Sequence, residues 1–214
     1  MTRLVLASAS PARRSVLRAA GIDPVVRVSD VDEDAVAAAL PAGTGPRDVV
    51  VELARAKARS VAAALAGETP GPDADLVVVG CDSMLLIDGE LQGKPHTPEV
   101  ALARWEAMAG NHADLVTGHC VLRLQEGVVT AEAIDCSATT VHFGKPDPDE
   151  LHAYIATGEP LRVAGAFTLD GMGGWFVDRI DGDPSSVVGI GLPLLRRLLQ
   201  EVGVGVARLW ADHT

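Results

Sequence analysis

Strand-like and helix-like segments alternate along this chain, and that alternation is what most restricts its possible folds. Residues 3–7 suit a short strand, and a helix should follow from Pro11 to about Ala20 and stop at Gly21. Ser10 is a good helix N-cap, and proline fits the first helical position because its missing N–H has no partner there. Further helices are expected over 47–66, 98–110, 148–157 and 193–202.

Strand and hairpin signals lie between these helices. One strand should begin at 73–75 and end at Val79, and another should run over 84–87 after the loop 80–83. Asp88-Gly89 is the strongest hairpin signal, and two longer strands are expected at 115–124 and 128–143. The chain should therefore form an α/β fold with a mixed, partly antiparallel, twisted sheet flanked by helices. Its 214 residues suit one domain spanning 1–214, with two small lobes as the alternative.

Composition and charge exclude several classes of protein. Hydrophobic residues make up 48% of the chain, too many for a disordered protein. The 18 basic and 29 acidic residues give a net charge of −11, which disfavours nucleic acid and anionic membranes as partners. The best candidate for a membrane span, residues 76–87, is interrupted by Asp82.

The cysteines and the N-terminus indicate a cytoplasmic protein. Cys81, Cys120 and Cys136 form no CxxC pair, which argues against a disulfide scaffold or a zinc site. The arginines that precede the first acidic residue, Asp23, resemble a transit peptide in composition. The apolar stretch 4–7 is too short for a secretion signal, so we expect a mature cytoplasmic chain.

The segment 8–14 has the features of an anion site. A strand leads into a helix N-terminus, whose unpaired N–H groups and positive dipole favour an anion. Ser8 and Ser10 add hydroxyl groups, and Arg13 and Arg14 lie in the first turn, where cations oppose the dipole unless a polyanion binds. A capped surface helix with two solvated arginines is the alternative, and these residues alone do not separate the two.

Other charged residues stand at positions that suit a site. Lys57 lies on the apparent inward stripe 50, 53, 57, 60 and 64 of a helix, so it must snorkel, pair with an acid or meet a ligand. Asp82 follows an apolar strand and is either a general base or metal ligand, or a turn-forming residue. Residues 32–34, with Glu33 at the centre, are either Mg²⁺ ligands or a solvated acidic turn, and Lys94 is a further possible phosphate partner.

Several common catalytic signatures are missing from the sequence. Residues 89–95 do not form a Walker A loop, because the glycines are too close together and Pro95 stands where that loop has Ser or Thr. The chain has neither an HExxH metal motif nor a GxSxG nucleophile elbow. Catalytic zinc and a histidine–serine nucleophile are therefore unsupported.

Taken together, the motifs resemble the Maf family of nucleoside triphosphate pyrophosphatases, which have an inosine-triphosphate-pyrophosphatase-like fold. The matching segments follow the family order and are LASASPARR (6–14), ELARAKA (52–58), GCDS (80–83), GKP (93–95), TG (117–118), AGAF (164–167), VVG (187–189) and LPL (192–194). The resemblance spans nearly the whole chain. It implies two lobes around a central cleft, and a homodimer is a family expectation.

The resemblance also implies an activity and a set of site residues. The expected reaction is hydrolysis of a nucleoside triphosphate between its α and β phosphates, with Mg²⁺ or Mn²⁺ as cofactor. Asp82 would be the proton acceptor that activates water, and Glu33 and Asp82 would be metal ligands. The triphosphate would be held by Ser8, Ser10, Arg13, Arg14, Lys57 and Lys94.

Two departures from the family pattern concern the substrate. Ser83 follows Asp82 where many members have Thr, which keeps the hydroxyl. Asp170 stands where the branch acting on dTTP and UTP has Gln, and where the branch resembling 7-methyl-GTP pyrophosphatases has Glu. A carboxylate only accepts hydrogen bonds, which suits the N–H donors of a guanine edge. Asp170 therefore favours a guanine-type base, and clearance of noncanonical or surplus nucleotides is the expected role.

One alternative belongs to another class of protein. The family name is associated with blocked septum formation, so the chain could be a nucleotide-binding regulator of cell division without essential catalysis. Such a protein would bind a triphosphate without needing Asp82.

Overall fold

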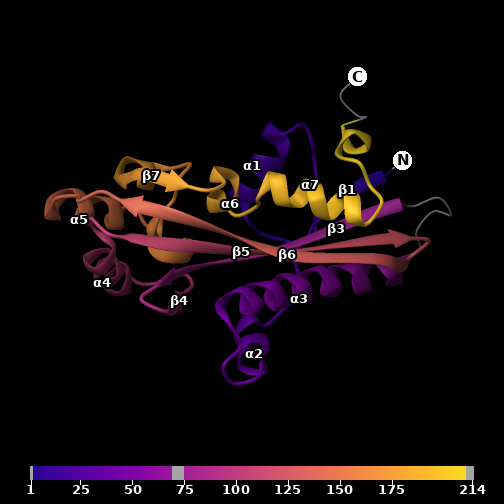
Figure 1. Cartoon of the computed structure of the whole chain (residues 1–214), viewed down its shortest axis with the longest axis horizontal. Helices are drawn as coiled ribbons and strands as arrows, with labels where there is room; N and C mark the ends of the chain where they lie inside the picture. Colours follow the sequence, from indigo (N-terminus) through magenta and orange to yellow (C-terminus); the bar gives the residue numbers. More distant parts are fainter. Residues whose placement is uncertain (1, 69–74, 211–214) are drawn as a thin grey trace. The chain divides into compact units, whose positions relative to one another are not determined.

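The computed structural model describes residues 2–68 and 75–210 of the chain. In these residues the strands are β1 (Thr2–Leu6), β2 (Val25–Val26), β3 (Asp75–Ile87), β4 (Glu90–Gln92), β5 (His112–Gln125), β6 (Val128–Phe143) and β7 (Val177–Asp181). The α-helices are α1 (Pro11–Ala19), α2 (Glu33–Ala38), α3 (Pro46–Gly67), α4 (Pro98–Met108), α5 (Pro148–Ala156), α6 (Pro184–Val188) and α7 (Leu192–Glu201) (Figure 1). The expected helices are confirmed to within one or two residues. The sequence patterns did not predict the short elements β2, α2 and α6.

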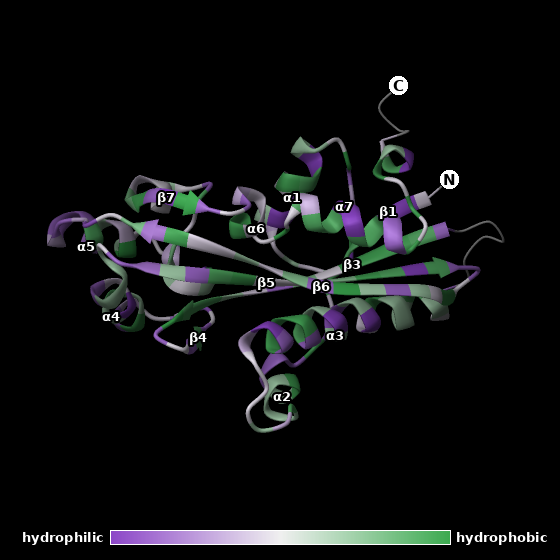
Figure 2. Ribbon diagram, in the orientation of Figure 1, coloured by the Kyte–Doolittle hydropathy of each residue, from purple (hydrophilic) through white to green (hydrophobic). Residues whose placement is uncertain are grey.

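The strands of the described residues form one seven-stranded mixed sheet, as the sequence predicts. Its order is β2-β1-β3-β5-β6-β7, and β4 pairs with β3 off this path. Strand β1 runs parallel to β2 and β3, whereas β3–β4 and β6–β7 are antiparallel. Asp88 and Gly89 both have positive φ, at 49° and 85°, which is the turn type that a two-residue hairpin prefers. Figure 2 shows the apolar character of β3, β5 and β6, interrupted by polar positions.

The chain divides into two compact units. The first, unit 1, contains residues 1–82, 117–137 and 189–214, and the second, unit 2, contains residues 83–116 and 138–188. Strands β3, β5 and β6 each contribute residues to both units, because the division falls within them.

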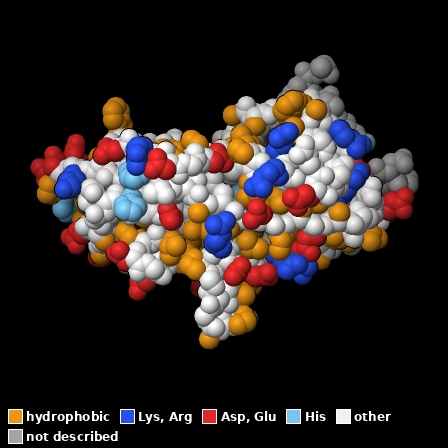
Figure 3. Space-filling view, in the orientation of Figure 1, with side chains coloured by type: hydrophobic (Ala, Val, Ile, Leu, Met, Phe, Trp, Pro, Cys, Tyr) orange, Lys and Arg blue, Asp and Glu red, His pale blue; other side chains and the backbone are white. Residues whose placement is uncertain are grey.

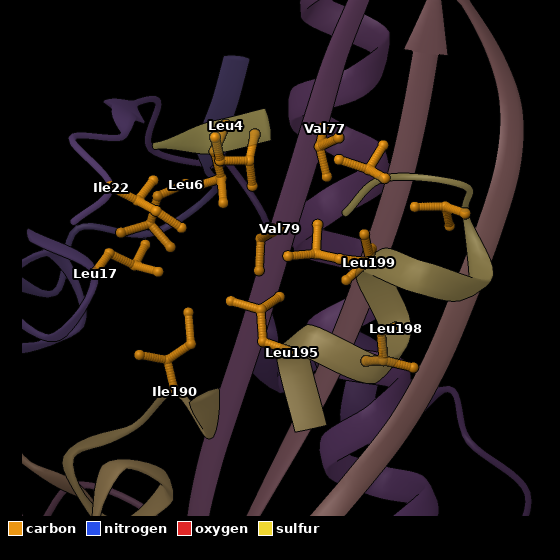
Figure 4. Close-up of a cluster of buried hydrophobic side chains, with 14 of the residues drawn as sticks. Leu4, Leu6, Leu17, Ile22, Val77, Val79, Ile190, Leu195, Leu198 and Leu199 are labelled. Atoms are coloured by element: carbon orange, nitrogen blue, oxygen red, sulfur yellow. The ribbon is translucent and has the colours of Figure 1, made fainter. Parts of the chain in front are cut away.

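Unit 1 has helices on both faces of its strands. Leu4 and Leu6 of β1, with Val77 and Val79 of β3, pack against α1 and α7 (Figure 4). The residues between them, such as Val5 and Val78, pack on the opposite face with the small side chains of α3. Successive side chains of a strand point to opposite faces, so each strand contributes to both cores.

Two glycines allow α3 to lie very close to the sheet. A Cβ on Gly80 would stand 2.2 Å from the carbonyl oxygen of Ala54, and a Cβ on Gly118 would stand 2.3 Å from that of Val50. The sequence suggested that the strand ends at Val79 and that 80–83 forms a loop, which is wrong. Strand β3 continues through these residues to Ile87, and Gly80 is present because the helix backbone needs the space. Residues 73 and 74 of the expected strand lie outside the described residues.

Unit 2 is built around Trp105 of α4. Its indole ring is fully buried, contacts Phe143 and Tyr154 edge to face, and donates a hydrogen bond to the carbonyl of Ala166. The glycine-rich stretch 165–174 packs tightly in this unit, since a Cβ on Gly173 would stand 2.5 Å from the Tyr154 hydroxyl.

The surface agrees with the acidic composition. Acidic side chains are spread over the face shown in Figure 3, with basic side chains among them. None of the helices in the described part of the chain combines the length and apolar composition needed to cross a membrane.

Candidate active site

The centre of the candidate site is an ion pair between Asp82 and Lys57 in unit 1. Lys57 Nζ donates to Asp82 Oδ1 at 2.6 Å, and the two residues are only 7% and 5% exposed. Lys57 lies on the buried face of α3, and Asp82 lies within β3, not at the end of a strand as the sequence suggested. Burying a charge is costly unless it is paired, so each residue makes the other acceptable in the interior.

Glu33 joins this pair from a helix that the sequence did not predict. Asp32 caps α2, its carboxylate accepting from the Ala35 N–H at 3.0 Å, and Glu33 is the first helical residue. Glu33 Oε1 lies 2.9 Å from Lys57 Nζ, and its side chain is 47% exposed. Lys57 therefore bridges one buried and one half-exposed carboxylate. The sequence left three alternatives for Lys57, which were snorkelling, pairing with an acid and contact with a ligand. The structure shows pairing with acids.

One oxygen of the central carboxylate has no partner. Asp82 Oδ2 is buried, and none of the described residues donates a hydrogen bond to it. A buried, unsatisfied carboxylate oxygen marks a place where a water, a proton or a cation belongs. No group of three or more His, Cys, Asp or Glu side chains in the described residues could hold a metal ion. Asp82 and Glu33 instead fit Mg²⁺, which commonly takes one or two carboxylates and completes its shell with waters and substrate phosphates.

Arg13 and Ser8 form a second cluster of polar groups in unit 1. Arg13 Nη1 donates to Ser8 Oγ at 3.1 Å, and Arg13 Nε donates to the Gly189 carbonyl at 2.7 Å. Ser10 caps α1 as predicted, its hydroxyl oxygen accepting from the Arg13 N–H at 3.3 Å. These bonds hold the guanidinium beside the N-terminus of α1, where the helix dipole adds positive potential.

The two clusters lie around the same buried thiol. Burial raises the pKa of Cys81 to about 11, while the positive charges of Arg13 and Lys57 act against this rise and Asp82 adds to it. Asp82 directly follows Cys81 in β3 and pairs with Lys57, and the N–H of Ala7, the residue before Ser8, donates to the Val79 carbonyl of the same strand at 2.8 Å. The strand register agrees, since Leu6, the last residue of β1, is level with Val79 of β3, so the segment carrying Ser8 leaves the sheet near the part of β3 that precedes Cys81.

Arg14 takes a different direction from Arg13. Its guanidinium lies 4.0 Å from Asp23, which also pairs with Arg18 at 2.9 Å, and all three side chains are about half exposed. In this structure Arg14 therefore belongs to an exposed ion-pair group at the surface of α1, which contributes little to stability.

The remaining predicted residues, Lys94 and Asp170, are exposed and lie in unit 2. The loop before Lys94 is anchored by the Gly93 carbonyl, which accepts from Arg104 and from the Gly165 N–H. Asp170 lies in a loop held by Glu159, whose carboxylate accepts from Thr168 Oγ1, the Met172 N–H and the Gly173 N–H.

Comparison with known proteins identifies the family. The profile described as "Maf-like protein" matches residues 3–202. The chain belongs to the Maf family. A protein of Nocardia farcinica (strain IFM 10152) is 79% identical over 207 residues, covering 97% of this chain and 96% of its own length. Relatives from Rhodococcus jostii (strain RHA1) and Rhodococcus erythropolis (strain PR4 / NBRC 100887) are 68% and 61% identical, each over at least 98% of both chains. All three relatives are named nucleoside triphosphate pyrophosphatase.

Two residues that hold the Arg13 cluster of this Maf protein were not apparent from the sequence. The carbonyl of Gly189 holds Arg13, and His119 binds the same turn through the Gly191 N–H. Gly189 falls in a matching motif, VVG, but nothing in that motif indicates a contact with a residue 176 positions away. His119 gave no signal, because a single histidine in a strand has no characteristic spacing.

Proposed function

We propose that this chain is a nucleoside triphosphate pyrophosphatase that hydrolyses its substrate between the α and β phosphates, releasing a nucleoside monophosphate and pyrophosphate. The names of the full-length relatives support this activity. The observation that carries it is the buried Asp82 carboxylate, which is paired with Lys57 through one oxygen and has no partner on the other. Clearance of noncanonical or surplus nucleotides is the role we propose for the reaction.

Each polar group has a part in the proposed reaction. Arg13, Ser8 and the N-terminus of α1 bind phosphate oxygens, because all of them present donors or positive charge at one place. When the substrate binds, the Lys57 ammonium group leaves one of its two carboxylate partners and contacts a phosphate oxygen. Asp82 then accepts a proton from the attacking water. Asp82 and Glu33 would hold a divalent cation, which would supply positive charge that offsets the charge of the polyphosphate.

Replacement of the proposed base tests this mechanism. Asp82→Asn keeps the shape of the side chain and removes its ability to accept a proton, so pyrophosphate release with Mg²⁺ or Mn²⁺ should fall by about 10²- to 10⁴-fold. Asp88→Asn is the matched control, since Asp88 lies in the turn after the same strand and Asn tolerates its positive φ of 49°. The control should keep the wild-type rate. Wild-type turnover by Asp82→Asn would exclude Asp82 as the base.

The same assay separates the enzyme from a regulator of cell division. A regulator would bind a triphosphate and leave it intact. Recovery of uncleaved triphosphate after long incubation of the wild-type protein with Mg²⁺ or Mn²⁺ would support that alternative and contradict hydrolysis.

The preferred base is proposed from Asp170. Its carboxylate accepts hydrogen bonds and donates none, which matches the adjacent N–H donors of guanine or 7-methylguanine. We expect kcat/KM for GTP or 7-methyl-GTP to exceed that for dTTP and UTP, and Asp170→Gln to reduce the difference by about tenfold, the cost of one mismatched hydrogen bond. Asp170→Glu, which keeps the carboxylate, is the control. A preference of the wild-type protein for dTTP or UTP would contradict this proposal.

A further inference from the structure

His119 is a buried, titratable side chain of unit 1 that the proposed reaction does not use. It lies on β5 and is 0% exposed. Its Nδ1 is 3.1 Å from the Thr117 carbonyl oxygen, and its Nε2 accepts from the Gly191 N–H at 2.9 Å. The partners determine the protonation of the ring. A carbonyl only accepts and a backbone N–H only donates, so His119 is neutral and carries its proton on Nδ1.

The histidine binds the turn that holds Arg13. The Gly191 N–H points to His119, and two residues earlier the Gly189 carbonyl accepts from Arg13 Nε at 2.7 Å. Ile190, between them, is fully buried in the core formed with α1 and α7. The turn is therefore fixed on one side by His119 and on the other by Arg13.

Gly189 is also adapted to this contact. Its φ is +121°, a conformation that other residues rarely adopt, and a Cβ there would stand 3.1 Å from Arg13 Nε. The close approach of the turn to the guanidinium thus depends on a particular backbone conformation, and His119 supplies a hydrogen bond that maintains it.

We propose that His119 is a positioning residue for substrate binding: its neutral Nε2 anchors the Gly189–Gly191 turn, which aligns the Arg13 guanidinium with the triphosphate. The inference rests on the proposed function, because it takes Arg13 to be a phosphate ligand. His119 does not touch the substrate. A positioning residue of this kind should affect how tightly the triphosphate binds and have little effect on the chemical step.

The test compares two replacements of the histidine. His119→Leu has a similar size but leaves the buried Gly191 N–H without an acceptor, so KM for the best triphosphate of the panel above should rise about tenfold, with kcat within about twofold of wild type. His119→Gln offers a carbonyl oxygen near the position of Nε2 and should restore most of the affinity. Rescue by Gln would not be expected if only the bulk of the ring mattered.

A double-mutant cycle with Arg13 identifies the route of the effect. Arg13→Ala should raise KM by about ten- to a hundredfold, because a charge-assisted hydrogen bond to phosphate is lost. In the Arg13→Ala background, His119→Leu should raise KM no further. Val121→Ala is the matched control, since Val121 is equally buried on the same face of β5; it should lower thermal stability and leave KM unchanged.

The possible results are distinguishable. An unchanged KM for His119→Leu, or an equal rise in KM with and without Arg13, overturns the inference and leaves the proposed function intact. A wild-type KM for Arg13→Ala removes Arg13 from the phosphate site and overturns the inference, whereas only loss of pyrophosphate release by the wild-type protein would overturn the proposed function. Should His119→Leu fail to fold, His119→Met takes its place in the same cycle, since its thioether is only a weak acceptor for the Gly191 N–H, and an equal rise in KM in both backgrounds again contradicts the route through Arg13.

Discussion

Gly80 controls the distance between the two residues at the centre of the site. A Cβ at this position would stand 2.2 Å from the Ala54 carbonyl oxygen and 2.8 Å from the Ala58 nitrogen. Ala58 directly follows Lys57, and Asp82 lies two residues beyond Gly80. The missing side chain therefore lets α3 approach β3 closely enough for Lys57 Nζ to reach Asp82 Oδ1 at 2.6 Å.

Gly80→Ala should weaken both stability and activity. Backbone atoms cannot yield as a flexible side chain can, so α3 must shift away from β3, at a cost of about 1–3 kcal/mol in the free energy of unfolding. The same shift lengthens the Lys57–Asp82 contact, and pyrophosphate release should fall with it. Gly67→Ala, in an open position at the end of the same helix, is the control and should be neutral or slightly stabilising. Urea unfolding and the release assay measure the two effects, and wild-type stability of Gly80→Ala would contradict this account.

At the scale of elements, an ion-pair network ties β6 to α3. Glu132 of β6 accepts from Arg55 Nε at 2.7 Å and from Arg59 Nη2 at 3.0 Å, and its side chain is 24% exposed. The hydrogen bond from Arg55, with help from Arg59, lowers the pKa of Glu132 below 4.5, although partial burial acts in the opposite direction. The folded state therefore favours the charged carboxylate.

The sign of this shift predicts how stability depends on pH. A carboxyl group with a lowered pKa in the folded state stabilises the protein above its unfolded pKa, and the gain is lost as pH falls through the folded value. Glu132→Gln should lower the free energy of unfolding by about 1 kcal/mol at pH 7, and the difference from wild type should shrink below about pH 4.5. Urea titrations between pH 7 and pH 4 measure it. Glu126→Gln, exposed in the turn before β6, should change little; a Glu132 effect that stays constant down to pH 4 would exclude the linkage.

At the scale of the molecule, the helices and the class of sheet could be predicted from the sequence. Ser10, Thr97 and the prolines that follow them begin helices at the expected residues, because caps and prolines act on their own backbone. The buried face of α3 was only partly predicted. Lys57 is buried as expected, but Ser60 is half-buried and Ala64 is exposed, because the buried face continues through Val61 instead. On a helix the next residue of a face can follow after three or after four positions, so the pattern alone did not choose between Ser60 and Val61.

The sequence by itself determined where most of the helices begin and which residues are candidates for the site, since an acid beside an apolar strand, a lysine on an inward helix face and a capped arginine-bearing helix are recognisable within a few positions. Only the tertiary structure decided how they are connected. The continuation of β3 through Gly80, the pairing of Lys57 with Glu33 and the support of Arg13 by the turn at Gly189 all depend on contacts between segments distant in the chain. A local sequence pattern reflects the backbone preferences of nearby residues. Contacts between distant segments depend on how those segments pack against one another in space, which no single segment specifies.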